Sequence, residues 1–382
     1  MELRKFVAPE FVFGVNAIDL AGRYAKNFGA TRALLVSDPG VWQAGWAKRV
    51  VDSLALEGVE YVAFSHVSPN PRSAEVMEGA DVFAENRCNV IVAVGGGSVI
   101  DCAKGIGIVS ANGGHVLQYE GVDKVPYPMP PIICIPTTGG TSADVSQFAI
   151  INHEAERVKI AIISKSLVPD VALIDPATLV TMDNYLTACT GIDALVHAIE
   201  AYVSNASSSF SDLHAREAIG LITSYLPLCL AEPNNLEARE KVMLGSLYAG
   251  LAFSNASLGA VHAMAHSLGG YLDLPHGECN ALLLPHVVGY NFDSAGQRYS
   301  EVARFMQLDM EGVPSGAFRT KLVDHLMKFR ENAGVSKSLS MCGVTHSDIA
   351  QLARKAMLDP CRITNPRKTT RSDIEVIYRE AL

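Results

Sequence analysis

The sequence predicts an α/β N-terminal domain with a parallel sheet, followed by an all-α C-terminal domain. In the first half, short apolar runs rich in β-branched residues alternate with stretches of helical periodicity. Strands separated by helices of about 10–15 residues favour a parallel sheet. From about residue 184 the chain is rich in alanine and leucine with helical spacing, and strand-like runs disappear. We therefore expect two domains, residues 1–183 and 184–382.

Each strand-like run of the first half ends at residues that break regular structure. The runs and their breakers are RALLVSD (32–38) before Pro39, VEYVAFS (59–65) before PNPR (69–72), VIVAVGGG (90–97) and PPIICIPTTGGTS (130–142). The carboxyl ends of parallel strands lie at one edge of the sheet, which is where ligands bind. We expect Asp38, Asn70 and the glycine and threonine loops to gather at this edge.

The second half has the periodicity of helices throughout. The helices expected from its apolar spacing and its breakers are 185–230, 235–254, 257–272, 297–310, 314–333, 346–357 and 371–381.

Composition argues against several classes of protein. The formal net charge is −9 and no basic stripe is present, so a nucleic-acid partner is not expected. The opening MELRKFVAPEFVFG is charged from residue 2 and is not a signal peptide, and no run of about 18 apolar residues predicts a membrane span. Eight cysteines, from Cys88 to Cys361, form no C-x-x-C pair, which is typical of reduced thiols in a cytoplasmic protein.

The stretch VIVAVGGGSVIDCAK (90–104) has the pattern of a strand, a glycine loop and a helix. Backbone N–H groups at such a helix N-terminus can bind a pyrophosphate. Gly95 and Gly97 fit the dinucleotide fingerprint G-x-G-x-x-G, but its third glycine is replaced by Ile100. From these residues alone, the loop is either structural or binds a nucleotide with another geometry.

Four or five metal-binding side chains lie in the helical half. Asp193 and His197 stand at i and i+4 on one helix face, and His262 and His266 repeat this spacing before His276. Burying several unpaired polar groups would cost about 1–3 kcal/mol each, whereas one shared divalent cation satisfies them together. Three imidazoles and a carboxylate suit Fe²⁺, Zn²⁺, Co²⁺ or Ni²⁺. The spacing does not distinguish His262 from His266 as the ligand.

Over nearly its whole length the chain resembles the iron-containing (group III) alcohol dehydrogenase family. The segments that carry the resemblance are PNP (69–71), GGGSVIDCAK (95–104), PTTGGTS (136–142), DPATL (175–179), TGIDALVHAIEAYVS (190–204), GLAFSNASLGAVHAMAHSLGG (250–270), PHGECNALLLPHV (275–287) and NPR (365–367). The resemblance implies a Rossmann-like nucleotide-binding domain joined to a helical metal-binding domain, the dehydroquinate synthase-like fold. It also implies a homo-oligomer, a dimer or larger.

The resemblance also implies roles for individual residues. The metal, Fe²⁺ with Zn²⁺ as the alternative, would be held by Asp193, His197, His262 and His276, and His266 would be a catalytic proton relay. The family's NAD-binding positions are Asp38, Asn70, Gly96, Gly97, Ser98, Thr137, Thr138, Thr141, Lys159 and Leu179. Asp38 would accept a hydrogen bond from the ribose 2′-hydroxyl and favour NAD over NADP. Phe148, Phe253 and Cys361 match substrate-pocket positions, which suits a short primary alcohol, diol or aldehyde.

One loop departs from the family pattern. Where the family has P-T-T-A-G-T-G-S-E, this chain has PTTGGTSAD. The chain therefore differs from the family pattern at Gly139, Ser142, Ala143 and Asp144. Ser142 places a side chain where the backbone approaches phosphate or adopts positive φ. Hydride transfer between an alcohol and NAD is the favoured function. The alternatives are a non-catalytic sensor or regulatory protein on the same fold, and an NAD-using, metal-dependent lyase of the dehydroquinate-synthase kind.

Overall fold

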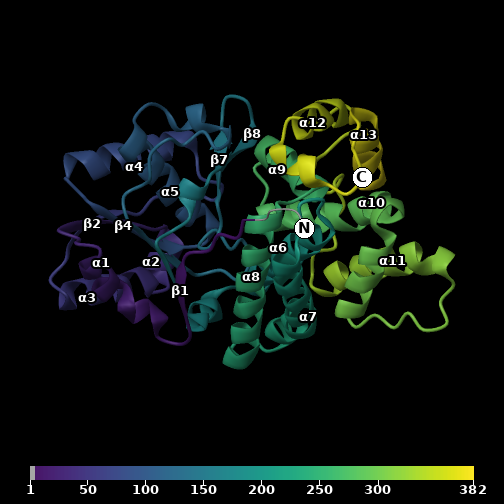
Figure 1. Ribbon diagram of the computed structural model, residues 1–382, viewed down its shortest axis with the longest axis horizontal. Coiled ribbons are helices and arrows are strands. Elements are labelled where there is room, and N and C mark those ends of the chain that lie inside the picture. The colour runs from purple at the N-terminus through teal and green to yellow at the C-terminus, as the bar shows by residue number, and fades with distance from the viewer. Residues whose placement is uncertain (1–4) are drawn as a thin grey trace. The chain divides into compact units, whose positions relative to one another are not determined.

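The computed structural model describes residues 5–382, which divide into two compact units. One unit is Val7–Met182; the other is Asp183–Leu382 together with residues 5–6. In Figure 1 the first runs from purple to teal and the second from teal-green to yellow. Each unit is described by itself.

A parallel sheet forms the centre of Val7–Met182. Among the described residues it has six strands, which pair in the order β1 (Glu10–Phe13), β9 (Val171–Ile174), β6 (Ile132–Pro136), β4 (Val90–Gly95), β2 (Arg32–Val36) and β3 (Glu60–Phe64). All five pairings are parallel. The predicted parallel sheet is therefore confirmed, and the carboxyl ends of β6, β4, β2 and β3 are neighbours along one edge.

Helices cover both faces of this sheet (Figure 1). Alternate residues of each strand point to opposite faces. Ala33 and Leu35 of β2 pack in one apolar cluster with residues of the helices α1 and α3, whereas Leu34 and Val36 pack in another with residues of α4 and α5. The helix bounds are α1 (Ala21–Asn27), α2 (Pro39–Gln43), α3 (Trp46–Leu56), α4 (Ser73–Glu85) and α5 (Gly97–Asn112).

A second, smaller sheet in this unit was not predicted from the sequence. Strands β7 (Phe148–His153) and β8 (Val158–Ile163) form an antiparallel hairpin, and β5 (Gly121–Val122) adds to β8. Ile151 and Ile160 of the hairpin pack in the same apolar cluster as α4 and α5. The hairpin therefore extends that core rather than forming a separate one.

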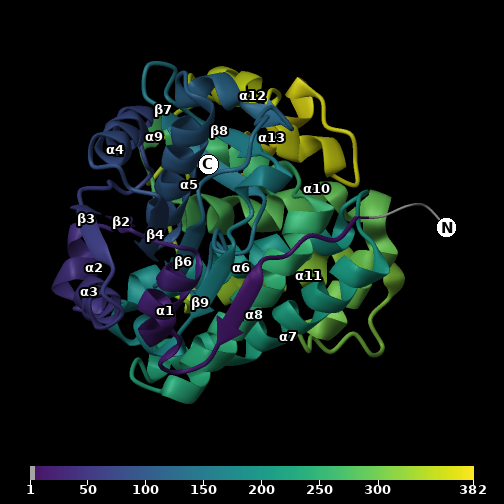
Figure 2. The ribbon, with the colours of Figure 1, turned by 60° about the vertical axis from the view of Figure 1, so that its left-hand side comes forward.

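The described residues of the second unit are helical and contain no strand, which confirms the predicted all-α half. Its helices are α6 (Asn184–Val203), α7 (Ser209–Ala231), α8 (Leu236–Ala256), α9 (Ala260–Leu272), α10 (His276–Phe305), α11 (Phe318–Asn332), α12 (Ile349–Ala356) and α13 (Arg371–Glu380). Helices α6, α7 and α8 pack side by side (Figure 2). No helix among the described residues is long and apolar enough to cross a membrane.

Two predicted helices were wrong in their bounds. The stretch 185–230 is two helices, because the chain breaks at residues 204–208, where Ser208 caps the N-terminus of α7. The helix predicted at 297–310 is the end of α10, which begins at His276. Gly277 and Pro285 weaken the helical signal of its first part, and Ala295 has non-helical angles (φ −139°, ψ 32°), so only the part after this kink was recognised.

Candidate metal centre and nucleotide-binding edge

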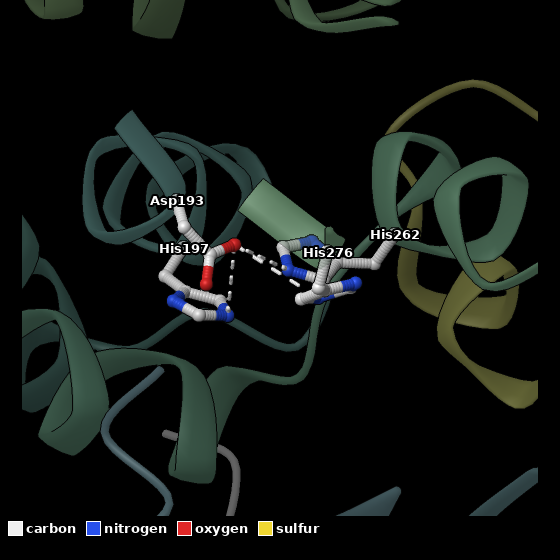
Figure 3. A group of neighbouring side chains, drawn as sticks. All are labelled: Asp193, His197, His262 and His276. Atoms are coloured by element: carbon white, nitrogen blue, oxygen red, sulfur yellow. Dashed lines mark ion pairs between the residues drawn. The ribbon is translucent and has the colours of Figure 1, made fainter. Parts of the chain in front are cut away.

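Four side chains from three helices converge inside the helical unit (Figure 3). Asp193 and His197 lie one turn apart on α6, His262 lies in the first turn of α9, and His276 is the first residue of α10. One ligand atom from each lies within 4.8 Å of the others. The Oδ1 atom of Asp193 is 3.9 Å from the Nε2 atom of His197, and 3.8 Å from that of His262 and of His276.

This arrangement fits a single transition-metal ion. Bonds of about 2.1 Å give a tetrahedral site with ligand–ligand distances of about 3.4 Å. The three separations from Oδ1 of Asp193 therefore need to contract by about 0.4–0.5 Å to reach it. Asp193, His197 and His262 are between 1% and 3% exposed. Burying a carboxylate and two imidazoles this deeply without a common binding partner costs folding free energy. The three nitrogens and one oxygen match the preference of Fe²⁺ or Zn²⁺.

Glu200 holds His262 from the side opposite the cluster. Its Oε2 atom lies 2.6 Å from Nδ1 of His262, and its Oε1 atom accepts a hydrogen bond from the backbone N–H of Val261 at 2.7 Å. Burial raises the pKa of Glu200 to about 7 and lowers that of His262. With the proton on Nδ1 facing Glu200, Nε2 of His262 presents its lone pair to the cluster.

Two side chains from distant parts of the unit cap the N-terminus of α9. Glu200 accepts from the N–H of Val261, and Oδ1 of Asn365 accepts from the N–H of Ala260 at 3.1 Å. Gly259, the residue before the helix, has no room for a side chain, because a Cβ atom there would lie 2.8 Å from Oε1 of Glu200. Two of the free backbone N–H donors at the start of α9, immediately before His262, are thus satisfied.

His266 forms a second buried group beside the cluster. Its Nδ1 atom lies 2.7 Å from Oδ2 of Asp359, and Oδ1 of Asp359 accepts from the N–H of Cys361 at 2.8 Å. Burial raises the pKa of Asp359, but His266 and the hydrogen bonds from Cys361 outweigh it, so the pKa is lowered. The His266 ring stacks on that of His276 with centroids 5.2 Å apart.

The three predicted pocket residues are divided between the units. Cys361 is fully buried beside Asp359, and Phe253 stacks on the ring of His197 with centroids 4.3 Å apart. Phe148 belongs to Val7–Met182, where it begins β7 and its carbonyl accepts from the ammonium of Lys104 at 2.8 Å.

The glycine loop and the threonine loop touch at the edge of the parallel sheet. The N–H of Thr137 donates to the carbonyl of Gly95 at 2.9 Å. A Cβ atom at Gly96 would lie 3.1 Å from Thr138, and one at Gly97 would lie 2.6 Å from Thr141. Gly97 is therefore needed for the contact between the loops, whatever ligand they hold.

A second contact at this edge joins three of the predicted nucleotide-binding residues. The N–H of Asn70 donates to the hydroxyl of Ser98 at 3.2 Å, and Nζ of Lys159 donates to Oδ1 of Asn70 at 2.6 Å. Asn70 has a left-handed backbone (φ 59°), a conformation that asparagine tolerates better than most residues. The structure thus brings Asn70, Ser98 and Lys159 together.

The other two predicted positions lie at the ends of strands or in a short helix. Asp38 follows β2 and caps α2, where its Oδ1 atom accepts from the N–H of Val41 at 3.0 Å. Leu179 is buried in the 3₁₀ helix Pro176–Thr181, which follows β9.

The loop that departs from the family pattern is buried. Ser142 has φ 50°, so it adopts the left-handed backbone for which glycine is the usual residue. Asp144 is 5% exposed, and burial raises its pKa to about 6, although backbone hydrogen bonding and Lys104 act in the opposite direction. The ammonium of Lys104 is also fully buried and donates to the carbonyls of Ser146 and Phe148, both at 2.8 Å.

We expect Asp144→Asn to stabilise the protein at pH 8 and to change its stability little near pH 4. The folded-state pKa of Asp144, about 6, is higher than the unfolded value of about 3.9. The folded chain therefore holds this proton more tightly, so stability is lost as the pH rises from about 4 to about 6, and the full cost of the ionised carboxylate is present above pH 6. Asparagine resembles the protonated form. Melting temperatures of variant and parent across this pH range test the expectation, and an equal difference at every pH would contradict it.

Sequence reasoning did not single out Glu200, Asn280 or Asp359. Glu200 lies three residues after His197 and Asn280 four after His276, so helical spacing from the histidines was the available signal. Asp359 is 93 residues from His266, and no local pattern joins them.

Two features indicate the class of this protein. The α/β unit has a glycine loop after a parallel strand, and the helical unit has a buried cluster of three imidazoles and a carboxylate. Together they are the features of a metal-dependent dehydrogenase. Two family models match the sequence: "Iron-containing alcohol dehydrogenase" over residues 8–176 and "Fe-containing alcohol dehydrogenase family, C-terminal" over residues 187–382. The chain belongs to the iron-containing alcohol dehydrogenase family, as its motifs predicted. It is an oxidoreductase that acts on alcohols, rather than a sensor or a lyase.

The chain is similar to curated dehydrogenases over its whole length. It is 36% identical to the NAD-dependent methanol dehydrogenase of Bacillus methanolicus, over 99% of each chain. It is 38% identical to the 1,3-propanediol dehydrogenase of Citrobacter freundii, over 97% of this chain and 96% of that one. The crystal structure of a 1,3-propanediol oxidoreductase aligns over 100% of both chains, with a TM-score of 0.96 and 37% identity.

Proposed function

We propose that this enzyme transfers hydride between a short primary alcohol or diol and NAD, with Fe²⁺ held by Asp193, His197, His262 and His276. The observation that carries the proposal is the convergence of these four side chains within 4.8 Å. A cation bound there would act as a Lewis acid toward the substrate oxygen. Zn²⁺ suits the same donors and is the alternative metal.

His266 is the proposed proton relay of this centre. The hydrogen bond from its Nδ1 atom to Asp359 leaves Nε2 able to exchange a proton. Asp359 orients the imidazole through this hydrogen bond, and His266 in turn lowers the pKa of Asp359. The stacking of His266 on His276 supports a place beside the metal ligands.

NAD is the proposed cofactor, bound at the edge formed by the glycine and threonine loops. Support comes from the contacts of Gly96 and Gly97 with the threonine loop and from the Asn70–Ser98–Lys159 hydrogen bonds. The first turn of α5 offers N–H groups to a pyrophosphate. We also propose Asp38 as the ribose ligand. The similar methanol dehydrogenase is NAD-dependent by name.

A small apolar pocket would select short substrates. We assign Phe253 and Cys361 to it; Phe253 against His197 and Cys361 beside Asp359 support this assignment. Phe148, which belongs to Val7–Met182, stays an expectation from the family resemblance. Similar enzymes are named for methanol and 1,3-propanediol. A cytoplasmic location is supported by the eight free cysteines, and the homo-oligomer expected from the family resemblance is retained as a proposal.

Metal reconstitution tests the proposed function. Metal-free protein is loaded anaerobically with Fe²⁺ or Zn²⁺ and assayed with short primary alcohols, diols and aldehydes, using NAD(H) and NADP(H) in parallel. We expect metal-dependent reduction of NAD by short primary alcohols and a lower KM for NAD than for NADP. The proposal would be contradicted if the protein is folded and loaded with metal but reduces neither NAD nor NADP with any alcohol of the panel.

A further inference from the structure

Asn280 lies in the middle of the candidate metal ligands. It is on α10, one helical turn after His276, and is fully buried. Its Nδ2 atom is 2.6 Å from Oδ1 of Asp193, 3.1 Å from Nε2 of His262 and 3.2 Å from Nε2 of His276. One amide group therefore contacts the coordinating atom of three of the four candidate ligands.

These distances match those between neighbouring ligands of one metal ion. With metal–ligand bonds of about 2.1 Å, adjacent corners of an octahedron are about 3.0 Å apart. The terminal amide atom of Asn280 stands at 2.6 to 3.2 Å from three coordinating atoms. It therefore occupies the place of a further corner of the same coordination shell.

The other end of the same amide has no hydrogen bond. Oδ1 of Asn280 is buried and has no hydrogen-bond partner among the described residues. Leaving a buried acceptor unsatisfied costs about 1–3 kcal/mol. A half turn about the Cβ–Cγ bond exchanges the two amide atoms, which are similar in size, and brings the oxygen to the corner that the nitrogen occupies. Amide oxygen has lone pairs for a cation, whereas amide nitrogen carries two hydrogens and donates only.

We propose that Asn280 is a fifth metal-binding residue, which turns its amide oxygen toward the cation held by Asp193, His197, His262 and His276. This inference rests on the proposed metal centre and extends it. A fifth protein donor adds a hard oxygen and raises the coordination number above four. That favours Fe²⁺, which takes up to six ligands, over a tetrahedral Zn²⁺ site.

Cobalt spectroscopy tests the proposal without any assay of activity. Metal-free protein is titrated anaerobically with Co²⁺, whose visible d–d bands report the number of ligands, and the dissociation constant is measured with a competing chelator. In Asn280→Leu we expect a changed d–d spectrum and affinity about tenfold weaker or more. Asn280→Asp keeps an oxygen at the same place, so we expect it to retain five-coordinate bands and to bind Co²⁺ at least as tightly as the parent.

The matched control is Asn86→Leu, at a half-buried asparagine of the other unit whose Nδ2 atom donates to the carbonyl of Val82 at 2.9 Å. We expect its cobalt spectrum to equal that of the parent. If Asn280→Leu fails to fold, as circular dichroism will tell, Asn280→Ala takes its place. A cobalt spectrum equal to that of the parent in folded Asn280→Leu or Asn280→Ala, which lack the amide oxygen, would overturn the proposal whatever their affinity for Co²⁺. A parent that binds no Co²⁺ would instead refute the metal centre itself.

Discussion

Asp193→Asn is expected to lose its bound metal and about 10³-fold or more in kcat/KM. Asp193 is the one carboxylate among the four candidate ligands, and its Oδ1 atom lies 3.8 to 3.9 Å from three histidine nitrogens. An amide in its place removes the negative charge that balances a dication in a buried site. A loss of 10³-fold corresponds to about 4 kcal/mol of transition-state stabilisation. Metal analysis and steady-state kinetics with an alcohol and NAD measure both effects.

The control for this substitution is Asp183→Asn, the same chemical change on the same helix. Asp183 caps the N-terminus of α6 by accepting from the N–H of Leu186 at 2.8 Å, and asparagine caps as well as aspartate does. We expect it to keep its metal and its activity. Full metal content and parental kcat/KM in Asp193→Asn would show that Asp193 is not a ligand.

Glu200→Gln is expected to weaken metal binding about 10- to 100-fold, although residue 200 does not touch the metal. Glu200 accepts from both the N–H of Val261 and Nδ1 of His262. Glutamine has one acceptor and one donor end. If its oxygen keeps the bond to Val261, its NH₂ group faces Nδ1, which then gives up its hydrogen to Nε2, and Nε2 can no longer bind a cation. The opposite orientation breaks the cap of α9.

Chelator competition with Co²⁺ and the melting temperature of the metal-free protein are the measurements for Glu200→Gln. The surface substitution Glu217→Gln, on α7 with a side chain 50% exposed, is the control for removing one glutamate charge. It is expected to change neither value. Co²⁺ affinity in Glu200→Gln equal to that of the parent would refute the role of Glu200 in orienting His262.

Much of the first unit was predictable, because local patterns determine it. The β2 and β4 runs are apolar, short and followed by breakers, so both strands and the edge at which they end could be inferred. The hairpin β7–β8 was missed, since its sequence reads as one irregular stretch and its pairing depends on packing against the core of α4 and α5. The left-handed backbone of Ser142 was foreseen from its place in a glycine position.

In the helical unit, the sequence indicated the candidate ligands but not their surroundings. Helical spacing related Asp193 to His197, and the family resemblance favoured His262 over His266 as a ligand. Glu200, Asn280 and Asp359 became visible only in three dimensions, because their contacts cross 62, 87 and 93 residues of chain. Pairings at such separations are set by tertiary packing, which a single sequence does not display.

Anomalous diffraction at the iron edge, from crystals of protein loaded anaerobically with Fe²⁺, tests the central claim most directly. The account predicts one iron site per chain, about 2.0–2.4 Å from a carboxylate oxygen of Asp193 and from Nε2 of His197, His262 and His276. Iron bound elsewhere in a crystal of active enzyme, with these four side chains not coordinated to it, would contradict the account.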